Sequence, residues 1–366
     1  MAACAIWALA CIGNSSAQTW TELPFLGDDI VCSGDGSLFF GAEGDGAHNL
    51  FKSTDAGETW NQIYHNSPKL VVCSGDGMKI AAYDAEVFVS TNSGATFSDA
   101  QVIANSCAWS ADGRVLATVG FGIYISTNNG MTLAKVGPPT YSSWNAVALS
   151  GDGRMVIAGP GSPIGPLYCS TNRGATWSAT PTPTNQWRGI TCGADGQKIA
   201  AITTQNYGVI YISTDGGVTW TGSEVGESQI TGLASSADGS LLTAAIDVFY
   251  ISRDFGASWT SSDPGRFMIE PTIGCSQDGN VLVAAMSGHF EVAHLAPPLK
   301  IAAEANQLTL SWPWPSSRYA LQQSPDLSSM IWGGVTNNIV VTNYRNQVIL
   351  SRSAAQAFYR LQGPNP

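Results

Sequence analysis

The chain has 366 residues, of which 12% are charged, and its formal net charge at pH 7 is −11. Such a chain can bury a large core, and its 40 glycines between short apolar runs are typical of an all-β protein. The 16 Lys and Arg form no cluster and are outnumbered by 27 Asp and Glu, which argues against nucleic acid or an anionic membrane surface as a partner.

Residues 1–17 have the pattern of a secretory signal peptide. The apolar run from Ala2 to Gly13 is too short to span a bilayer, and Ser15-Ser16-Ala17 offers small residues for cleavage. The alternative is a buried N-terminal helix. We expect an exported protein, secreted, periplasmic or at the cell surface, with no membrane span in the mature chain.

Four of the eight cysteines precede the residue that opens a repeated turn: Cys32, Cys73, Cys192 and Cys275. Equivalent positions of successive repeats point the same way in separate sheets, so we expect buried free thiols and no disulfide framework. The sequence has no CxxC and no Cys/His zinc spacing, and its four histidines are scattered. We therefore expect no metal and no cofactor.

Two short motifs alternate along residues 18–295. The first reads Ser-Gly-Asp-Gly or a close variant, at 33–36, 74–77, 110–113, 150–153, 193–196, 236–239 and 276–279. Asp-Gly between two apolar runs indicates a tight hairpin, because glycine adopts positive φ at little cost. The second reads Ser-x-Asp/Asn-x-Gly-x-Thr-Trp or a close variant, at 53–60, 90–97, 126–133, 170–177, 213–220 and 252–259.

The unit at residues 70–97 illustrates the predicted order of strands. Strands over 70–73 and 78–82 flank an Asp-Gly turn, and strands over 86–90 and from Thr96 flank the second motif. Four antiparallel strands make one propeller blade, and seven Asp-Gly turns predict seven blades. Thr19-Trp20 matches the end of a second motif, so we expect the strand 18–23 to pair with the last unit and close the ring.

The repeats stop after Leu295. The segment 296–298, Ala-Pro-Pro, predicts a stiff linker, and the alternating runs of 299–366 predict a small β-sandwich. Leu308–Trp312 and Phe358–Leu361 resemble the small accessory modules that end many secreted bacterial proteins.

The second motif resembles the Asp-box, or BNR, repeat of the sialidase-like propellers. The resemblance covers residues 18–295 and implies a seven-bladed β-propeller with four-stranded antiparallel blades and each box between the third and fourth strands. The box residues that we expect to hold the turn, and not to act as acids, are Asp55, Asn92, Asn128, Asn172, Asp215 and Asp254. The three Asn support this view, because an amide cannot donate a proton as an acid.

Strand alternation places both motifs on one face of the ring. The connections from second to third strand and between units lie on the opposite face, called the loop face here, where the resemblance implies that ligand sites lie. Sialidases are similar to one another in three arginines that grip a carboxylate, one of them in Arg-Ile-Pro. This chain has no Arg-Ile-Pro, and only Arg188 and Arg266 fall on the loop face, so we do not expect sialidase activity.

The ligand-binding candidates are aromatic and polar residues of the loop face. Aromatic rings stack on sugars, and four of them fall in consecutive units: Tyr141, Trp144, Trp187 and Tyr207. Polar side chains five residues before a turn should surround the mouth of the central channel: Asp28, Lys69, Asn105, Asn145 and Arg188, with Thr231 in the next unit. The alternative for each is packing over strand ends or exposure to solvent.

These features predict a non-catalytic module that binds a glycan or an extracytoplasmic protein, and we expect a monomer. The alternative is a glycoside hydrolase or lyase with two loop-face carboxylates, about 5–5.5 Å apart for retention or about 6.5–9.5 Å apart for inversion. The loop face offers many carboxylates, so the sequence does not single out a pair.

Overall fold

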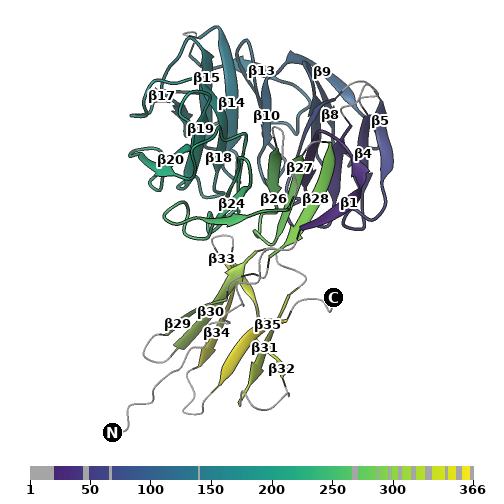
Figure 1. The fold of residues 1–366 in the computed structure, drawn as a ribbon, viewed down its shortest axis with the longest axis vertical. Coiled ribbons are helices and arrows are strands. Elements are labelled where there is room, and N and C mark those ends of the chain that lie inside the picture. Colours follow the sequence, from purple (N-terminus) through teal and green to yellow (C-terminus); the bar gives the residue numbers. More distant parts are fainter. Residues whose placement is uncertain are drawn as a thin grey trace. The chain divides into compact units, whose positions relative to one another are not determined.

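The computed structural model describes residues 20–43, 49–65, 68–138, 141–265, 271–286, 288–295, 297, 299–303, 307–314, 319–325, 332–342, 345–351 and 357–362. The predicted signal segment 1–17, Arg266 and most of the predicted linker lie outside these residues. The described part is all β, without a helix (Figure 1). It therefore contains no helix that could cross a membrane. Two compact units divide at the boundary between His294 and Leu295.

The described residues of the first unit form seven four-stranded antiparallel sheets. Sheet one contains β2 (Asp29–Cys32), β3 (Phe39–Ala42), β4 (Asn49–Ser53) and β5 (Asn61–His65). Sheet two contains β6 (Leu70–Cys73), β7 (Ile80–Tyr83), β8 (Glu86–Ser90) and β9 (Ser98–Ile103). Sheet three contains β10 (Ser106–Trp109), β11 (Leu116–Val119), β12 (Ile123–Ser126) and β13 (Ala134–Val136).

The next sheets repeat this order. Sheet four contains β14 (Ser143–Leu149), β15 (Val156–Ser162), β16 (Tyr168–Ser170) and β17 (Ser178–Ala179). Sheet five contains β18 (Trp187–Cys192), β19 (Ile199–Thr203), β20 (Val209–Ser213) and β21 (Thr221–Glu224). Sheet six contains β22 (Gly232–Ser235), β23 (Leu242–Ala245), β24 (Phe249–Ser252) and β25 (Thr260–Ser262).

Sheet seven joins the two ends of the repeat region. It contains β26 (Thr272–Cys275), β27 (Val281–Met286), β28 (His289–His294) and, beside β28, β1 (Trp20–Leu26). β1 pairs antiparallel with β28, and Trp20 lies opposite Ala293. The Trp20 indole also donates to the Ser262 hydroxyl of sheet six at 2.9 Å. The N-terminal strand thus supplies the fourth strand of the last sheet.

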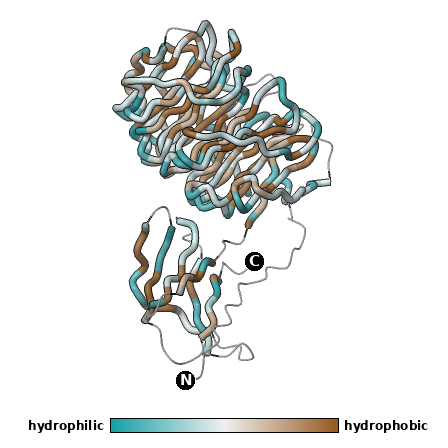
Figure 2. The backbone as a smooth tube through the Cα atoms, turned by 90° about the vertical axis from the view of Figure 1, so that its left-hand side faces the viewer, coloured by the Kyte–Doolittle hydropathy of each residue, from teal (hydrophilic) through white to brown (hydrophobic). Residues whose placement is uncertain are grey.

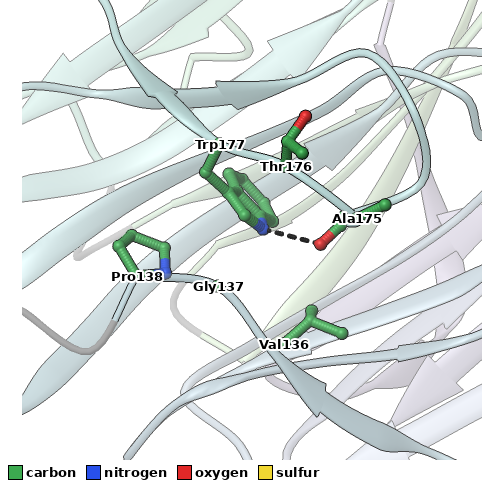
Figure 3. A pocket seen from close by; sticks show the side chains of 7 residues that line it. Val136, Gly137, Pro138, Ala175, Thr176 and Trp177 are labelled. Carbon is green, nitrogen blue, oxygen red and sulfur yellow. Dashed lines mark hydrogen bonds between the residues drawn. The ribbon is translucent and has the colours of Figure 1, made fainter.

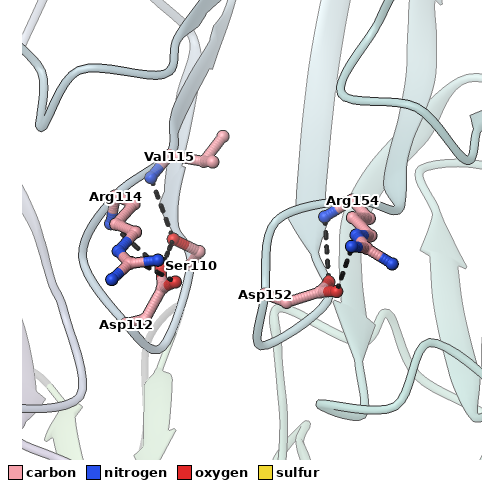
Figure 4. A network of polar contacts seen from close by, with 6 residues as sticks. All are labelled: Ser110, Asp112, Arg114, Val115, Asp152 and Arg154. Atoms are coloured by element: carbon pink, nitrogen blue, oxygen red, sulfur yellow. Dashed lines mark hydrogen bonds and ion pairs between the residues drawn. The ribbon is translucent and has the colours of Figure 1, made fainter.

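The Asp-Gly turns share one side-chain network. In the turn of sheet three, Ser110 Oγ donates to Asp112 Oδ1 at 2.7 Å and accepts from the Val115 N–H at 3.0 Å, while the Arg114 N–H donates to the same carboxylate (Figure 4). Arg114 and Arg154 also lie over the turn carboxylates of their own sheets (Figure 4). The turn is thus held by groups within six residues, which explains why the motif repeats.

The Asp boxes have a second local network. In the first box, Ser53 Oγ donates to Asp55 Oδ1 at 2.7 Å and accepts from the Gly57 N–H at 2.8 Å. The Thr59 N–H and hydroxyl both donate to the same carboxylate. In an Asn box the last bond is reversed, and Asn92 Nδ2 donates to Thr96 Oγ1 at 2.9 Å. Asp and Asn therefore hold the same turn.

A ring of main-chain hydrogen bonds connects the seven Asp-Gly turns, and we call it the axial ring. Each turn donates an N–H to a carbonyl of the next turn, at 2.7 to 3.3 Å, through Gly34, Gly75, Ala111 with Asp112, Gly151, Ala194, Ala237 and Gln277. The last bond, from the Gln277 N–H to the Gly34 carbonyl at 2.9 Å, returns to sheet one. The sheets are therefore linked in a closed cycle.

The axial ring leaves little room for side chains. A Cβ on Gly75 would lie 2.3 Å from Gln277 Nε2 and 2.8 Å from the Ala111 carbonyl oxygen. A Cβ on Gly34 would lie 2.7 Å from Gln277 Cδ. The Gln277 side chain thus lies across Gly34 and Gly75, so that a side chain at either position would displace it.

The core of the first unit lies between neighbouring sheets. Apolar stretches recur along its strands, while polar residues are frequent in its turns (Figure 2). Sheets three and four share a cluster that includes Val119, Ile123, Val147 and Val156, all almost fully buried. The six described cysteines are free, and burial raises the pKa of the Cys73 thiol to about 12. These thiols pack as small apolar groups.

The second unit contains two further sheets. One has the order β29 (Lys300–Ala303), β30 (Gln307–Pro313), β34 (Arg345–Ser351) and β33 (Val340–Thr342). The other has the order β32 (Gly333–Gly334), β31 (Ala320–Ser324) and β35 (Phe358–Gln362). Leu310, Trp312, Leu321 and Val348 form their shared core.

Gly193 is the one turn-opening residue that lacks the serine hydroxyl, since the six other turns have Ser in its place. A Cβ there would meet only ordinary contacts at 3.5 Å, and the neighbouring Asp195 already accepts from the Gln197 N–H. We predict that Gly193→Ser raises the free energy of unfolding by about 1 kcal/mol, because it adds the missing hydrogen bonds. Urea unfolding measures the change.

The reverse substitution in sheet three, Ser110→Gly, is the matched control and should lower stability by a similar or larger amount. A Gly193→Ser variant less stable than the natural chain would contradict the assigned role of the turn serine.

Candidate functional site on the loop face

The loop face contains the starts of the innermost strands, β2, β6, β10, β14, β18, β22 and β26. Two of the predicted ligand-binding residues, Asp28 and Lys69, are exposed immediately before β2 and β6. Lys69 Nζ lies 3.3 Å from Asp84 Oδ2, and both side chains are about half exposed. Lys69 therefore pairs within sheet two, whereas the side chain of Asp28 has no hydrogen bond or ion pair with a described residue, although its N–H donates to the Ala42 carbonyl at 2.9 Å.

Asn105 connects sheets three and four. Its Nδ2 donates to the Trp144 carbonyl at 3.0 Å and lies 3.2 Å from Asn145 Oδ1. Ser143 Oγ donates to the same Asn145 oxygen at 3.2 Å. The structure thus brings Asn105 and Asn145 together, and Asn105 links two sheets. Thr231 forms a comparable link, since its hydroxyl donates to the Pro271 carbonyl at 2.7 Å.

Asn145 and Arg188 both occupy β-bulges. In sheet four, Trp144 pairs with Pro160 and Ala146 with Gly159, so that Asn145 has no partner across the strand. In sheet five, Trp187 pairs with Thr203 and Gly189 with Ile202, which leaves Arg188 in the same position. A bulge turns the side chains around it relative to regular alternation.

The prediction that Trp144 and Trp187 offer their rings to a ligand is wrong, because their exposed fractions are 1% and 0%. Trp144 packs between sheets three and four, and Trp187 between sheets four and five. The Trp187 indole donates to the Gly165 carbonyl at 2.8 Å, so its polar group is satisfied inside the protein. Both tryptophans therefore belong to the core.

Tyr141 and Tyr207 have different environments. Tyr141 is half-buried against Trp144 and Tyr168, and burial with the Tyr168 hydroxyl raises its pKa to about 12. Tyr207, in the connection between β19 and β20, is 60% exposed. Of the four predicted aromatic residues, Tyr207 is therefore the one whose ring a ligand could cover.

Arg188 is half-buried and forms no hydrogen bond or ion pair with any residue that the structure describes. Sequence reasoning placed it at the channel mouth without distinguishing it from its neighbours in the ring. Its isolation is unusual, because burying part of a charged group without a partner costs free energy. Arg188 is thus the strongest polar candidate on this face.

Asp29 is one of the loop-face carboxylates among which the sequence did not single out any residue. It is 8% exposed, and its Oδ2 accepts from the Val71 N–H of sheet two at 2.9 Å. Burial raises the pKa of Asp29 to about 6, although the Val71 hydrogen bond opposes the shift. The sequence could have singled out Asp29 because it is an acidic residue at the first position of an inner strand. The equivalent strands of sheets two and six begin with the uncharged residues Leu70 and Gly232.

The box carboxylates have the opposite behaviour. Hydrogen bonds from the Thr59 hydroxyl and N–H and from Ser53 lower the pKa of Asp55 to about 2. The equivalent bonds lower the pKa of Asp215 and Asp254 to about 2. These groups are ionised at neutral pH and are bonded to their own turns, so they are poorly suited to donate a proton.

An open pocket of about 410 Å³ lies between the end of the outer strand of sheet three and the box of sheet four. Val136, Gly137 and Pro138 after β13 form one wall, and Gly174 to Trp177 of the sheet-four box form the other (Figure 3). The Trp177 indole donates to the Gly174 carbonyl at 3.0 Å. None of the residues that line the pocket has a titratable side chain.

The loop face can therefore supply hydrogen-bond donors and an aromatic surface. Among the described residues, no group of three or more His, Cys, Asp or Glu could hold a metal ion. The carboxylates with identified contacts are already engaged, since Asp84 pairs with Lys69 and Asp247 accepts from Ser228 at 2.9 Å.

Comparison with known proteins identifies the repeat and the fold. The BNR/Asp-box repeat family matches residues 211–221, which span β20 and the box of sheet five. No curated protein sequence matches the chain. A chain in the structure titled "Crystal Structure of Mitotic Checkpoint Complex" is similar at a TM-score of 0.59 and 13% identity, over 81% of this chain and 96% of that chain.

The similarity to solved structures concerns the fold alone. As many as 1572 chains match, and a fold shared so widely supports many unrelated functions. The function has to be argued from the site.

Asp29 makes a testable contribution to the pH dependence of stability. An acid whose pKa rises from 3.8 to about 6 on folding stabilises the protein fully below pH 4, and this contribution is lost as the pH rises to 6. The amide of Asp29→Asn can still accept from Val71 without charge. We predict that this variant exceeds the natural chain in unfolding free energy by about 2 kcal/mol at pH 8, and by much less at pH 4.

Urea unfolding at a series of pH values from 4 to 8 tests this prediction. The box carboxylates do not interfere, because their pKa of about 2 places their titration below this window. Identical pH dependence in the variant and the natural chain would show that Asp29 is not the titrating group.

Proposed function

We propose that this chain is an exported, seven-bladed Asp-box β-propeller with a small C-terminal β-sandwich. In this proposal the loop face binds a glycan or an extracytoplasmic protein, and no reaction is catalysed. The blade count is supported by the seven sheets and by the axial ring that returns from Gln277 to Gly34. Export is supported by the pattern of residues 1–17, and the sandwich by the two sheets that share the Leu310 core.

The observation that carries the binding proposal is the difference between the two faces. On the box side, the carboxylates and hydroxyls of the turns bond to each other within the same turn. On the loop face, the guanidinium of Arg188 has no partner among the described residues, and the ring of Tyr207 is 60% exposed. An unused donor in β18 and an exposed aromatic ring in the connection from β19 to β20 are the kinds of group that a ligand site uses.

A glycosidase needs two carboxylates that both reach the substrate. Asp29 has the raised pKa of a general acid, but it faces the Val71 N–H and is 8% exposed. The neighbouring Asp28 is exposed, which leaves the glycosidase as the alternative to be tested against binding.

Binding to a panel of immobilised polysaccharides, with a parallel assay for released sugar, tests the proposal. We expect the full chain to bind one class of glycan without releasing sugar. The other supporting result is binding of a single exported protein, which is then retested in pure form. Tyr207→Ala should weaken binding by about tenfold, since stacking on an aromatic ring contributes roughly 1 kcal/mol or more.

Met131→Ala is the matched control, because Met131 is 76% exposed within the third box on the opposite side. It should bind like the natural chain. Release of sugar that is abolished by substituting a loop-face carboxylate would replace the binding proposal by the glycosidase. Equal loss of binding in both variants would exclude the loop face as the site.

A further inference from the structure

We propose that Arg188 and Asn145 form a subsite for one carboxylate group of an acidic saccharide, at the mouth of the channel on the loop face. This inference rests on the proposed binding function and specifies its ligand. It is based on two independent observations, the paired β-bulges and the unused hydrogen-bond donors.

The two bulges occur at equivalent positions of neighbouring sheets. Asn145 and Arg188 each lie five residues before the residue that opens the Asp-Gly turn, and β14 packs beside β18. The innermost strands β2, β6, β10, β22 and β26 pair with their neighbours without a shift of register. The irregularity is thus confined to the two inner strands that carry Asn145 and Arg188.

Each bulge accompanies a buried tryptophan and a half-buried polar residue that is not paired across the strand. Trp144 and Trp187, directly before the bulged residues, fill the interface with the preceding sheet. Asn145 and Arg188 remain outside the strand pairing and are half-buried, whereas both tryptophans are fully buried. Bulges are frequent beside binding sites because they redirect a side chain in this way.

The amide of Asn145 is held in a defined orientation. Its Oδ1 accepts from Asn105 Nδ2 and from Ser143 Oγ, both at 3.2 Å. The side chain lies against Gly161, where a Cβ would approach its amide atoms to 2.3–2.4 Å. The oxygen is therefore occupied, while Nδ2 donates to no described residue and is available to a ligand.

Arg188 adds a second group that can only donate. A guanidinium has five N–H donors and no acceptor, and its planar fork matches the two oxygens of a carboxylate. With the Asn145 Nδ2, it presents donors without an acceptor, which selects a ligand group that accepts only. A carboxylate meets this requirement with two charged oxygens that match the guanidinium fork, whereas a sugar hydroxyl offers one uncharged oxygen.

The surroundings favour a saccharide over an anionic polymer of higher charge. Tyr207, in the same sheet as Arg188, offers an exposed ring that can cover the apolar face of a sugar. Carboxylates such as Asp28, Asp84 and Asp247 outnumber the cations of this face, so a densely charged ligand would be repelled. A saccharide that carries one carboxylate and is otherwise uncharged can cover the Tyr207 ring and avoids this repulsion.

Calorimetric titration of the full chain with a short neutral oligosaccharide that ends in a single uronic acid tests the inference, and the methyl ester of that uronic acid is the matched probe. The two probes share the sugar and differ only in the carboxylate. We expect the acid form to bind about 10- to 100-fold more tightly, which corresponds to a charge-assisted hydrogen-bonded pair. The preference should weaken as salt is added.

Arg188→Gln should abolish the preference for the acid form without unfolding the chain, because Arg188 has no partner to lose. Asn145→Asp should do the same by placing a second carboxylate beside Arg188. Arg173→Gln is the matched control, since Arg173 is exposed on the box side, and it should retain the preference.

Equal affinity for the acid and methyl-esterified probes, or an acid preference that survives Arg188→Gln, would overturn the carboxylate subsite. In that case, a glycan or protein that still binds in a manner sensitive to Tyr207→Ala would leave the proposed function intact. Loss of the acid preference in Arg173→Gln as well would place the anion on the box side and also overturn the subsite.

Discussion

The axial ring is the constraint on which the rest of the first unit depends. Seven turns have to converge until each N–H reaches the carbonyl of the next turn, and the cycle closes where Gln277 donates to Gly34. This convergence leaves no room for a Cβ at Gly34 or Gly75, because the Gln277 side chain already occupies the space beside them. The ring also fixes the distance between inner strands, and therefore the interfaces in which the apolar residues are buried.

The two ends of the inner strands use different chemistry. At the turn end, the links between sheets are main-chain hydrogen bonds that repeat around the axis. At the loop end, each link is different: Asp29 accepts from Val71, Asn105 donates to Trp144, and Thr231 donates to Pro271. Much of the sequence variation at the channel mouth is therefore used to join sheets, and only the side chains that remain unengaged can recognise a ligand.

The repeated parts of the fold could be predicted from the sequence, because their hydrogen bonds are local. The box and the Asp-Gly turn are each held by side chains a few residues apart, so the motif contains its own structural explanation. The pairing of the N-terminal strand with β28 could also be predicted, since Thr19-Trp20 matches the last two residues of a box. The periodicity could not, however, reveal that the Gln277 side chain packs against Gly34 and Gly75 of two other turns.

The site could be predicted less well, because it depends on departures from the repeat. β14 and β18 each contain one extra residue, directly after Trp144 and Trp187. Both tryptophans lie buried between neighbouring sheets, although the sequence predicted that their rings would be exposed. Such a bulge is visible only once the strand register is known. The role of Asp29 depends on Val71, 42 residues away in the chain, and no local pattern encodes this contact.

Native-state hydrogen exchange of the axial-ring amides tests the central claim most directly. If the ring closes the repeat region, the amides of Gly34, Gly75, Gly151, Ala194, Ala237 and Gln277 should exchange only through global unfolding, with one shared free energy of opening. Exchange of the Gln277 amide at a much lower free energy than that of Gly151 would mean that sheets seven and one separate independently, and would contradict a closed ring.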